Sequence, residues 1–429
     1  MKRRVLIVSP YFPPINAADH HRIRMSLPYL REFGWEPIIL CVDPSFIEGI
    51  TDSYLELTIP SDIEVLQSYA IPPQISRKVG LGNLALRSIP FLINTVSKYL
   101  EKNSIDLVYF SNTVFLTMAL GRYWLKQYKI PYVLDFQDLW LSDYYDRTNN
   151  PPPGGKLKYK TSQLLAKILE PFALKKVSHI TSVSSEYPQI LKQRYPWLQD
   201  QQFTILPFGA PENDFKILAS LNIKQKIFDP NDGYQHWVYV GRGGDDMKFS
   251  INALFAAIQR HRHQFCNLWQ NIKIHFVGTK YSIFDNNREI EAIAKSYDID
   301  DLVTEYPQRV SYFEALQVLK DSHTILIIGS DDQGYSASKV YPCILARKPI
   351  LAILHQQSLV VDVINQCQAG LVANFNSNST IAEVSDMVMQ LIDKLLTSDS
   401  LPTTNWEMFE PYTAKKMTQI LCNIFDKSV

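Results

Sequence analysis

The sequence lacks three features that would each place it in a special class of protein. No stretch approaches the ~20 consecutive apolar residues of a membrane-spanning helix. The five cysteines are scattered and do not form the close pairs of a zinc site. The 43 basic side chains balance the 43 acidic ones, so no overall field attracts nucleic acid. We therefore predict no nucleic-acid partner, no bound metal, no disulfide bond and a reducing, cytoplasmic location.

Two further elements are missing near the start of the chain. Residues 1–4 are basic, but the apolar run at residues 5–8 is too short for the core of a secretory signal peptide. Residues 15–18 read INAA, where a dinucleotide-binding fold would have the glycines of a GxGxxG motif. Binding of NAD at this loop is therefore not expected.

What the chain does contain is enough apolar sequence for more than one core. Its 429 residues are 46% hydrophobic and 20% charged, which is typical of a globular protein with two domains. Short apolar runs alternate with helical patterns, which predicts parallel sheets covered by helices. We predict an N-terminal domain at residues 1–212, a linker at 213–235, a C-terminal domain at 236–403, and a terminal helix within 404–429 that packs back toward the first domain.

A glycine-rich turn follows the predicted strand at residues 237–240. Gly241 and Gly243 would let the backbone approach a ligand closely. Arg242 and Lys248 add one fork-shaped and one point-like cation, a pair suited to a diphosphate. The alternative is a tight turn with two surface cations.

A second polar turn follows the predicted strand at residues 324–328. Ser336, Ser338 and Lys339 stand where a helix is expected to begin. Free N–H groups and the helix dipole favour an anion at such a position. The alternative is a serine-capped core helix with a surface lysine. Residues 278–280, after another predicted strand, are expected to form a third wall of the same site.

In the N-terminal domain, two carboxylates lie at the carboxyl end of the predicted strand at residues 132–135. Asp135 and Asp138 are candidates for a general base or for orienting a hydroxyl group, although Asp138 is equally suited to cap the next helix. The loop at residues 9–21 carries His20 and its neighbours, which either face a ligand or serve as solvated or capping residues.

Residues 71–100 are bounded by prolines, mildly basic and apolar in patches. Two interpretations stay open for this stretch. It would either touch an acceptor or a membrane surface, or form a helical insertion packed on its own domain.

Six segments, in their order along the chain, resemble the GT-B glycosyltransferases, in particular family 4 of nucleotide-sugar-dependent enzymes. They are SPYFPP, LDFQDLW, HITSVSSEY, TILPFGAP, YVGRGGDDMK and SASKVYPCILARKPIL. The resemblance implies two Rossmann-like, doubly wound parallel-sheet domains facing across a cleft. It also implies transfer of a sugar, with retained configuration, from a nucleoside-diphosphate sugar such as a UDP- or GDP-sugar.

The resemblance assigns roles to Arg242, Lys248, Ser336, Ser338, Lys339, Asp135 and Asp138, and the positions of the predicted loops add the other residues of the predicted site. The donor diphosphate would be bound by Gly241, Arg242, Gly243, Lys248, Ser336, Ser338 and Lys339. The donor sugar or nucleotide would contact Gly278, Asp331, Asp332, Gly334 and Tyr335. The reaction centre would include His20, Asp135 and Asp138, and the acceptor would meet Asn16, Asp19 and His21.

The predicted function is therefore metal-independent glycosyl transfer to a glycan, glycolipid or small-molecule acceptor, without a cofactor. Many family members carry glutamates where this chain has Gly334 and Pro342. Two alternatives follow: a nucleotide-sugar epimerase on the same fold, or a non-catalytic nucleotide-sugar-binding or scaffold protein. The enzyme is expected in the cytoplasm, with contact to the inner face of a membrane left open.

Overall fold

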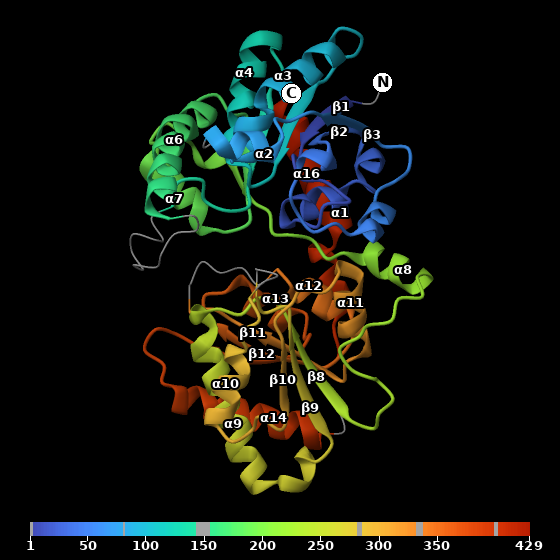
Figure 1. Cartoon of the computed structure of the whole chain (residues 1–429), viewed down its shortest axis with the longest axis vertical. Helices are drawn as coiled ribbons and strands as arrows, with labels where there is room; N and C mark the ends of the chain where they lie inside the picture. Colours follow the sequence, from blue (N-terminus) through green and yellow to red (C-terminus); the bar gives the residue numbers. More distant parts are fainter. Residues whose placement is uncertain (1–2, 80–81, 143–154, 281–284, 332–337, 399–401) are drawn as a thin grey trace. The chain divides into compact units, whose positions relative to one another are not determined.

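The computed structural model describes residues 3–79, 82–142, 155–280, 285–331, 338–398 and 402–429. The chain divides into two compact units, shown in Figure 1. Unit 1 comprises Met1–Gly209 and Ala414–Val429, and unit 2 comprises Ala210–Thr413. Each unit contains one parallel sheet with helices on both faces, so the predicted fold class is confirmed.

Unit 1 has a seven-stranded sheet in the order β3-β2-β1-β4-β5-β6-β7. Every pair of neighbouring strands is parallel. The strands are β1 (Arg3–Val8), β2 (Trp35–Val42), β3 (Glu64–Ser68), β4 (Leu107–Ser111), β5 (Tyr132–Phe136), β6 (His179–Ser182) and β7 (Phe203–Ile205).

The described helices of unit 1 connect these strands. The α-helices are α1 (His21–Ser26), α2 (Pro73–Ser76), α3 (Leu84–Leu100), α4 (Ala119–Tyr128), α6 (Lys156–Leu174), α7 (Glu186–Arg194) and α16 (Ala414–Ser428). Short 3-10 helices are η1 (Ala18–His20), η2 (Leu30–Phe33), η3 (Pro44–Phe46), η4 (Ser53–Thr58), η5 (Arg77–Val79), η6 (Phe115–Met118) and η7 (Asp200–Gln202).

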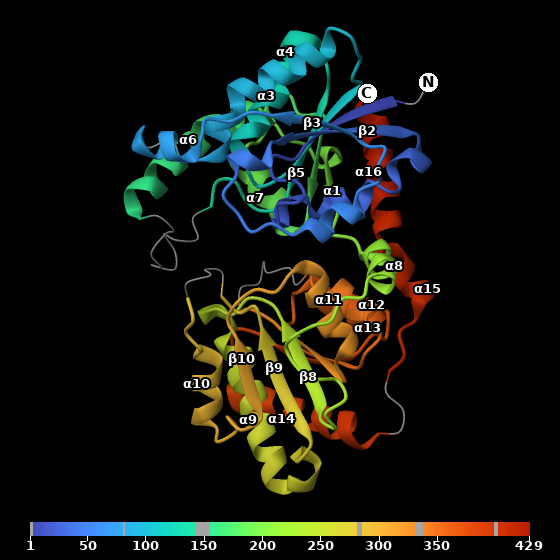
Figure 2. The ribbon, with the colours of Figure 1, turned by 45° about the vertical axis from the view of Figure 1, so that its right-hand side comes forward.

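Strand β1 lies in the centre of the unit 1 sheet and faces two cores. Leu6 and Val8 pack in the core under α3 and α4, whereas Val5 and Ile7 pack in the core that contains α1 and α16. Figure 2 shows these helix pairs on opposite faces of the sheet. A strand buried on both faces must be apolar at successive positions, which explains the short apolar runs of the sequence.

Unit 2 has a six-stranded parallel sheet in the order β10-β9-β8-β11-β12-β13. Its strands are β8 (Gln235–Val240), β9 (Ile272–Val277), β10 (Val303–Tyr306), β11 (Thr324–Ile328), β12 (Ile350–His355) and β13 (Leu371–Phe375). Its described helices are α8 (Glu212–Ser220), η8 (Asp245–Met247), α9 (Lys248–Gln264), η9 (Cys266–Trp269), α10 (Glu289–Ser296), α11 (Tyr312–Asp321), α12 (Val340–Leu345), α13 (Leu359–Gln366), α14 (Ile381–Thr397), α15 (Trp406–Phe409) and η10 (Glu410–Tyr412).

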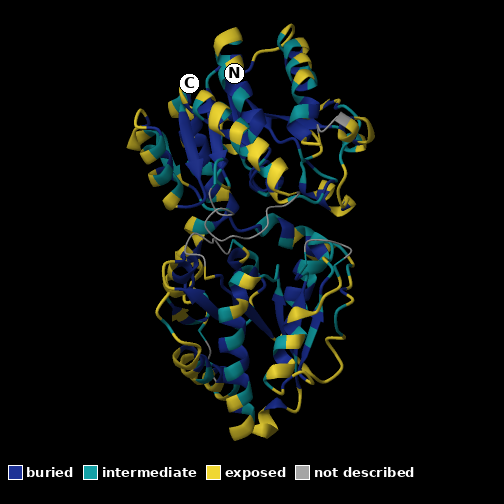
Figure 3. Cartoon of the chain, turned by 60° about the vertical axis from the view of Figure 1, so that its left-hand side comes forward, coloured by how far each residue is buried: buried dark blue, intermediate teal, exposed yellow. Residues whose placement is uncertain are grey.

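The unit 2 sheet is also covered on both faces. Trp237 and Tyr239 of β8 lie in the core formed with α9 and α14, and Val238 lies in the core formed with α11, α12 and α13. In Figure 3 the strands of each unit are buried, while the outer faces of the helices are exposed.

The polar stretch predicted as a linker, residues 213–235, belongs to unit 2. Helix α8 begins it, with Leu218 in the unit 2 core and the Asp214 carboxylate accepting a hydrogen bond of 2.6 Å from the Tyr312 hydroxyl. Phe228 packs against the same core. Because these few apolar side chains are widely spaced, the stretch shows no clear periodicity in the sequence.

Two helices begin or end where prolines interrupt the expected pattern. Between β1 and β2, α1 is followed by the separate 3-10 helix η2, and Pro28 lies between these two helices. Gly34 ends this region, with a left-handed φ of 87°. The terminal helix expected within residues 404–429 is likewise divided around Pro411, so that α16 starts only at Ala414. Proline has no N–H to donate within a helix.

None of the helices in the described ranges combines the length and apolar character needed to cross a bilayer.

Helix α16 supplies part of the unit 1 core, and its contribution can be measured. The buried Phe425 ring packs edge-on against Trp35 at 5.3 Å and Tyr109 at 5.1 Å between ring centroids. We expect Phe425→Ala to lower the free energy of unfolding by about 3–5 kcal/mol, since it leaves a cavity. Urea unfolding followed by tryptophan fluorescence measures this change.

The matched control is Asn423→Ala on the exposed side of the same helix. It should change the free energy of unfolding by less than about 0.5 kcal/mol. Equal effects of the two substitutions would contradict the assignment of α16 to the core.

Candidate functional site

The strand order of unit 2 creates a switch point between β8 and β11. From β8 the sheet continues through β9 on one side and through β11 on the other. The two strands pair through Trp237 with Thr324 and Val238 with Ile325, and this ladder stops before either strand ends. Open α/β sheets bind their ligands at such a point, beyond the carboxyl ends of the strands. The loops that follow β8 and β11 are therefore the candidate site.

The glycine-rich loop after β8 is fixed against the end of β9. The Gly241 N–H donates to the Val277 carbonyl at 2.9 Å, and the Gly243 N–H donates to the Thr279 carbonyl at 2.7 Å. These two bonds hold the loop flat along the sheet edge. The 3-10 helix η8 and then the first N–H groups of α9 follow this loop.

Lys339 approaches this loop closely at Gly241, which has no side chain. A Cβ atom on Gly241 would lie 2.8 Å from the Lys339 Nζ atom and 2.7 Å from the Tyr239 hydroxyl. Burial of the Lys339 ammonium and the charges of Arg309 and Arg242 lower its pKa to about 8. More than a third of the residue's surface is nevertheless exposed, so it is the ammonium end that protein surrounds. No carboxylate in the described ranges pairs with it.

Arg242 is held by a partner that the sequence patterns did not identify. Its guanidinium donates to both carboxylate oxygens of Asp246, at 2.8 and 2.6 Å. Burial raises the pKa of Asp246, but hydrogen bonds from Arg242 and Ser330 more than offset this, and the pKa lies below its usual value. Asp246 therefore stays ionised and fixes the orientation of the guanidinium.

Lys248 opens α9 and is more exposed than the other two predicted cations. Its ammonium pairs with Asp245 at 2.6 Å, and this bond raises the pKa of Lys248. The side chain is half exposed and lines the same pocket as Gly243 and Gly244. It is thus a half-exposed, charged lysine at the rim of the site.

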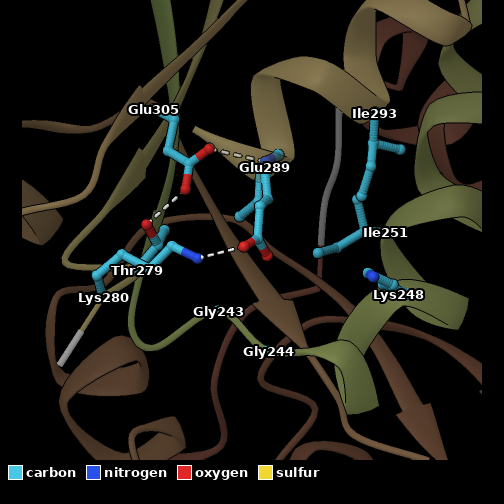
Figure 4. A pocket seen from close by; sticks show the side chains of 10 residues that line it. Gly243, Gly244, Lys248, Ile251, Thr279, Lys280, Glu289, Ile293 and Glu305 are labelled. Carbon is cyan, nitrogen blue, oxygen red and sulfur yellow. Dashed lines mark hydrogen bonds and ion pairs between the residues drawn. The ribbon is translucent and has the colours of Figure 1, made fainter. Parts of the chain in front are cut away.

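A small hollow, open to solvent, lies beside the glycine-rich loop (Figure 4). It is lined by Gly243, Gly244, Lys248, Ile251, Thr279, Lys280, Glu289, Ile290, Ile293 and Glu305. Figure 4 shows Lys280 and Glu289 pointing toward each other, with 2.8 Å between Nζ and Oε1. Residues 279 and 280 of the expected third wall therefore do line the pocket.

Glu305 is buried behind this pocket and holds two of its walls together. Its carboxylate accepts the Thr279 hydroxyl at 2.5 Å and the Ile290 N–H at 2.7 Å. Sequence patterns identified neither Glu305 nor Glu289, because β10 and α10 follow no motif. Arg309, in the loop after β10, was missed for the same reason.

The loop after β11 is described only in part. Asp332, Gly334, Tyr335 and Ser336, which were predicted to contact the ligand, lie outside the described residues. Asp331 is exposed, and its N–H donates to the Asp246 carbonyl at 2.8 Å, which joins the two loops. Ser338 is half-buried just before Lys339, and Gly278 has a left-handed φ of 76° beside Arg309.

In unit 1, Asp135 is part of a buried ion pair and does not reach the surface. Arg22 Nε donates to its Oδ2 at 2.7 Å, and neither side chain is exposed. Ser111, Thr181 and Gln137 donate to the same carboxylate at 2.9, 2.7 and 3.0 Å. With both oxygens bonded to the protein, Asp135 is positioned to orient its neighbours and not to take a proton from a ligand.

The loop after β1 meets the loop after β4 at the switch point of unit 1. Asp19 accepts hydrogen bonds from the N–H and the hydroxyl of Thr113, at 3.0 and 2.9 Å. Burial raises the pKa of Asp19, although these bonds work in the opposite direction. Asn16 is half-buried, and its N–H donates to the Ile50 carbonyl at 2.8 Å.

His20 and His21 are held neutral by their surroundings. Burial, with a smaller effect of Arg24, lowers the pKa of His20 to about 3, and its Nε2 lies 2.8 Å from the Ile15 carbonyl. Burial and the charge of Arg24 also place the pKa of His21 well below its usual value. Neither ring can act as a cation near neutral pH.

Asp138, in contrast, is exposed just beyond the end of β5. Its carboxylate accepts a hydrogen bond of 2.8 Å from the Leu139 N–H. Of the three predicted catalytic residues, it is the one whose carboxylate or ring is accessible from outside unit 1. Among the described residues, no group of three or more histidines, cysteines or carboxylates is arranged to hold a metal ion.

No protein-family model matches the sequence, and no curated protein matches it either. Solved structures match almost the whole chain. HepE of Anabaena, crystallised with UDP and glucose, has 13% identity and a TM-score of 0.60, with 98% of each chain covered. Sucrose-phosphate synthase of Thermosynechococcus elongatus has 13% identity and a TM-score of 0.61, with 99% of this chain and 98% of that chain covered.

A third match is a structure described as a putative UDP-N-acetylglucosamine 2-epimerase from Listeria monocytogenes. It has 10% identity and a TM-score of 0.50, with 98% of this chain and 95% of that chain covered. At these identities the likeness establishes the architecture alone. The chain has the GT-B fold that its sequence segments predicted.

The buried ion pair of unit 1 provides a stability test. We expect Arg22→Leu to lower the free energy of unfolding by about 3–5 kcal/mol, because it leaves the Asp135 carboxylate buried without its cation. Arg22 also donates to the Leu206 carbonyl at 2.7 Å, which would lose its partner. Urea unfolding compares the variant with the unmodified protein.

The control is Arg3→Leu, which removes a half-exposed ion pair with Asp426 of similar length, 2.9 Å. This variant should change the free energy of unfolding by no more than about 1 kcal/mol. A loss from Arg22→Leu as small as that from the control would mean that the pair is not a structural support.

Proposed function

We propose that the protein is a glycosyltransferase that uses a nucleoside-diphosphate sugar, with the diphosphate bound at the β8–β11 switch point of unit 2. The observation that carries this proposal is the convergence of Lys339, Arg242 and Arg309. Their mutual repulsion, together with burial, depresses the pKa of Lys339. A bound diphosphate would offset that repulsion, and the flat glycine loop would let it approach the start of α9.

The same groups suit the chemistry of sugar transfer. When the bond from the anomeric carbon to the diphosphate breaks, the leaving oxygen gains negative charge, and cations already in place stabilise it without reorganisation. Arg242 is oriented by Asp246, and Lys339 is confined by Gly241. We propose that this set acts without a metal ion, as the resemblance implies.

We propose that the hollow beside the loop marks where the nucleoside part of such a donor lies. Ile251 and Ile293 offer an apolar wall for a base, and the Glu289 carboxylate offers acceptors for ribose hydroxyls. Structures of HepE with UDP and with UDP-glucose make the uridine nucleotides the first candidates to test.

On unit 1, we propose that Asp138 orients the acceptor hydroxyl or accepts its proton as the new glycosidic bond forms. Its exposure at the end of β5 supports this role. Asp135 would act indirectly, through the ion pair that fixes the end of the same strand. The roles of Asn16, Asp19 and His21 toward an acceptor, and of Ser338 and Asp331 toward the donor, remain proposals.

Donor binding can be tested with a matched pair of arginine variants. We expect the unmodified protein to bind UDP, and Arg242→Ala to bind it about ten- to a hundred-fold more weakly, since one charge-assisted hydrogen-bonding group is lost. Arg262→Ala is the control. Arg262 lies near the C-terminal end of α9 and also pairs with an aspartate, Asp301, through two bonds of 2.6 and 2.7 Å. Isothermal titration calorimetry gives the affinities.

The activity itself is separated from its alternatives by the products formed from UDP-sugars. A transferase releases UDP slowly from the donor alone and faster when an acceptor is added. Conversion of the free UDP-sugar into its epimer would instead assign the protein to the epimerases. Binding without either product would point to a non-catalytic nucleotide-sugar-binding protein, and absence of binding to any nucleoside diphosphate would overturn the proposed site.

The depressed pKa of Lys339 predicts how donor binding depends on pH. In the free protein Lys339 loses its proton near pH 8, whereas a bound diphosphate would hold the proton and raise the pKa toward its usual 10.5. UDP affinity should therefore be highest below about pH 8 and fall as pH rises toward about pH 10. Titrations across this interval measure the change.

Lys339→Arg provides the control, because a guanidinium keeps its charge throughout this pH range. Its UDP affinity should be nearly constant where that of the unmodified protein falls. A parallel decline in both proteins would show that another group is responsible.

A further inference from the structure

Helix α6 of unit 1 has an inner face that is packed and an outer face that is not. Its buried residues are Ala166, Glu170, Ala173 and Leu174. Glu170, the one acidic residue of this helix, accepts hydrogen bonds from the Tyr195 hydroxyl at 2.7 Å and the Leu141 N–H at 2.9 Å. The inner face of α6 is thus fully packed against unit 1. Helix α6 lies beside α4 at the edge of this unit (Figures 1 and 2).

The outer face carries a stripe of large apolar side chains. Leu157, Leu164, Ile168 and Phe172 are 79%, 60%, 59% and 39% exposed. Their spacing of seven, four and four residues puts them on one side of an α-helix. Thr161 lies on the same side between Leu157 and Leu164, and the Arg122 guanidinium covers the Phe172 ring at 4.5 Å from its centroid. Single exposed apolar residues are common, but Leu157, Leu164 and Ile168 together on one side of a helix indicate a surface that is covered by something.

Lysines border this stripe on both sides. Lys160 and Lys167 run along one flank, seven residues apart, and Lys158 lies on the other, all of them exposed. Lys175 and Lys176 continue the basic border beyond the helix end. No carboxylate in the described part of the chain pairs with any of these lysines, and the only acid of α6 faces inward.

The charge and the apolar side chains of this face indicate which kind of partner could cover it. An apolar stripe bordered by unpaired lysines is the pattern of a helix that lies in the plane of a membrane. Lysine stems extend from such a helix along the apolar surface, so that their ammonium groups reach the headgroups. Anionic headgroups would supply negative charges for lysines that have no carboxylate partner among the described residues.

We propose that α6 docks unit 1 on an anionic lipid bilayer, with its apolar stripe among the acyl chains and its lysines at the headgroups. This inference is independent of the donor site and of the proposed reaction. It also moves the membrane contact away from residues 71–100, where the sequence had suggested it. Helix α3 in that stretch buries Leu84, Leu92 and Val96 in the unit 1 core, so its apolar patches are already covered.

The test is flotation of the full chain with vesicles of phosphatidylcholine alone or with about one-third phosphatidylglycerol. The unmodified protein is expected to float with the anionic vesicles, to remain behind with the neutral ones, and to be released by high salt. Leu164→Ser/Ile168→Ser should weaken binding to anionic vesicles by at least about ten-fold, because two inserted side chains are lost. Both residues are exposed, so the fold should persist, and circular dichroism checks it.

The matched control is Leu57→Ser/Ile75→Ser, which removes a leucine and an isoleucine that are 52% and 59% exposed elsewhere on unit 1. It should bind like the unmodified protein. Binding of the α6 variant at the unmodified level, or no binding of the unmodified protein to anionic vesicles, would overturn the proposal. A dimer in solution that becomes a monomer in the α6 variant would also overturn it, because a second copy would then cover the stripe.

Discussion

The contact between Lys339 and Gly241 is the constraint on which the site of unit 2 depends. In its present position the ammonium occupies space that a side chain at residue 241 would contest, and it lies there among other cations. Such crowding is unfavourable in the free protein, and it is maintained because β8, β11 and the start of α9 are fixed by a buried parallel sheet. The stability of the sheet thus maintains a group of neighbouring cations whose mutual repulsion a bound anion would reduce.

Unit 1 uses charge in the opposite way. Its central charges, Arg22 and Asp135, neutralise each other away from solvent, and hydroxyl and amide groups complete their hydrogen bonds. The pair ties α1 to the end of β5, so the strand end that carries the exposed Asp138 has a fixed position. Unit 2 thus holds Lys339 near other cations at its sheet edge, whereas unit 1 pairs Arg22 with Asp135 inside.

Sequence patterns predicted the central strands of both sheets because those strands are buried on both faces and therefore apolar throughout. They missed β3 and β10, the edge strands Glu64–Ser68 and Val303–Tyr306, since half-exposed edges mix polar and apolar residues. Glycine and cation motifs identified Gly241, Arg242 and Lys339 at the site. Sequence patterns could not predict Asp246, Glu305 and Arg309, because their contacts depend on which loops the sheet brings together. The burial of Asp135 could not be predicted for the same reason. The sequence does not distinguish an exposed carboxylate at a strand end from one that is buried in an ion pair.

Because α16 comes from the C-terminal end of the chain, unit 1 cannot complete its core until this helix has been synthesised. Unit 2 is continuous along the chain, Ala210–Thr413, whereas the core of unit 1 needs residues from both Met1–Gly209 and Ala414–Val429. During synthesis, the later unit therefore has all of its residues before the earlier one does. Until Leu421 and Phe425 emerge, Trp35 and Tyr109 on the nascent first unit lack the helix that covers them. A domain that is synthesised first would thus finish folding last, and its exposed aromatic face is where a chaperone would bind in the interval.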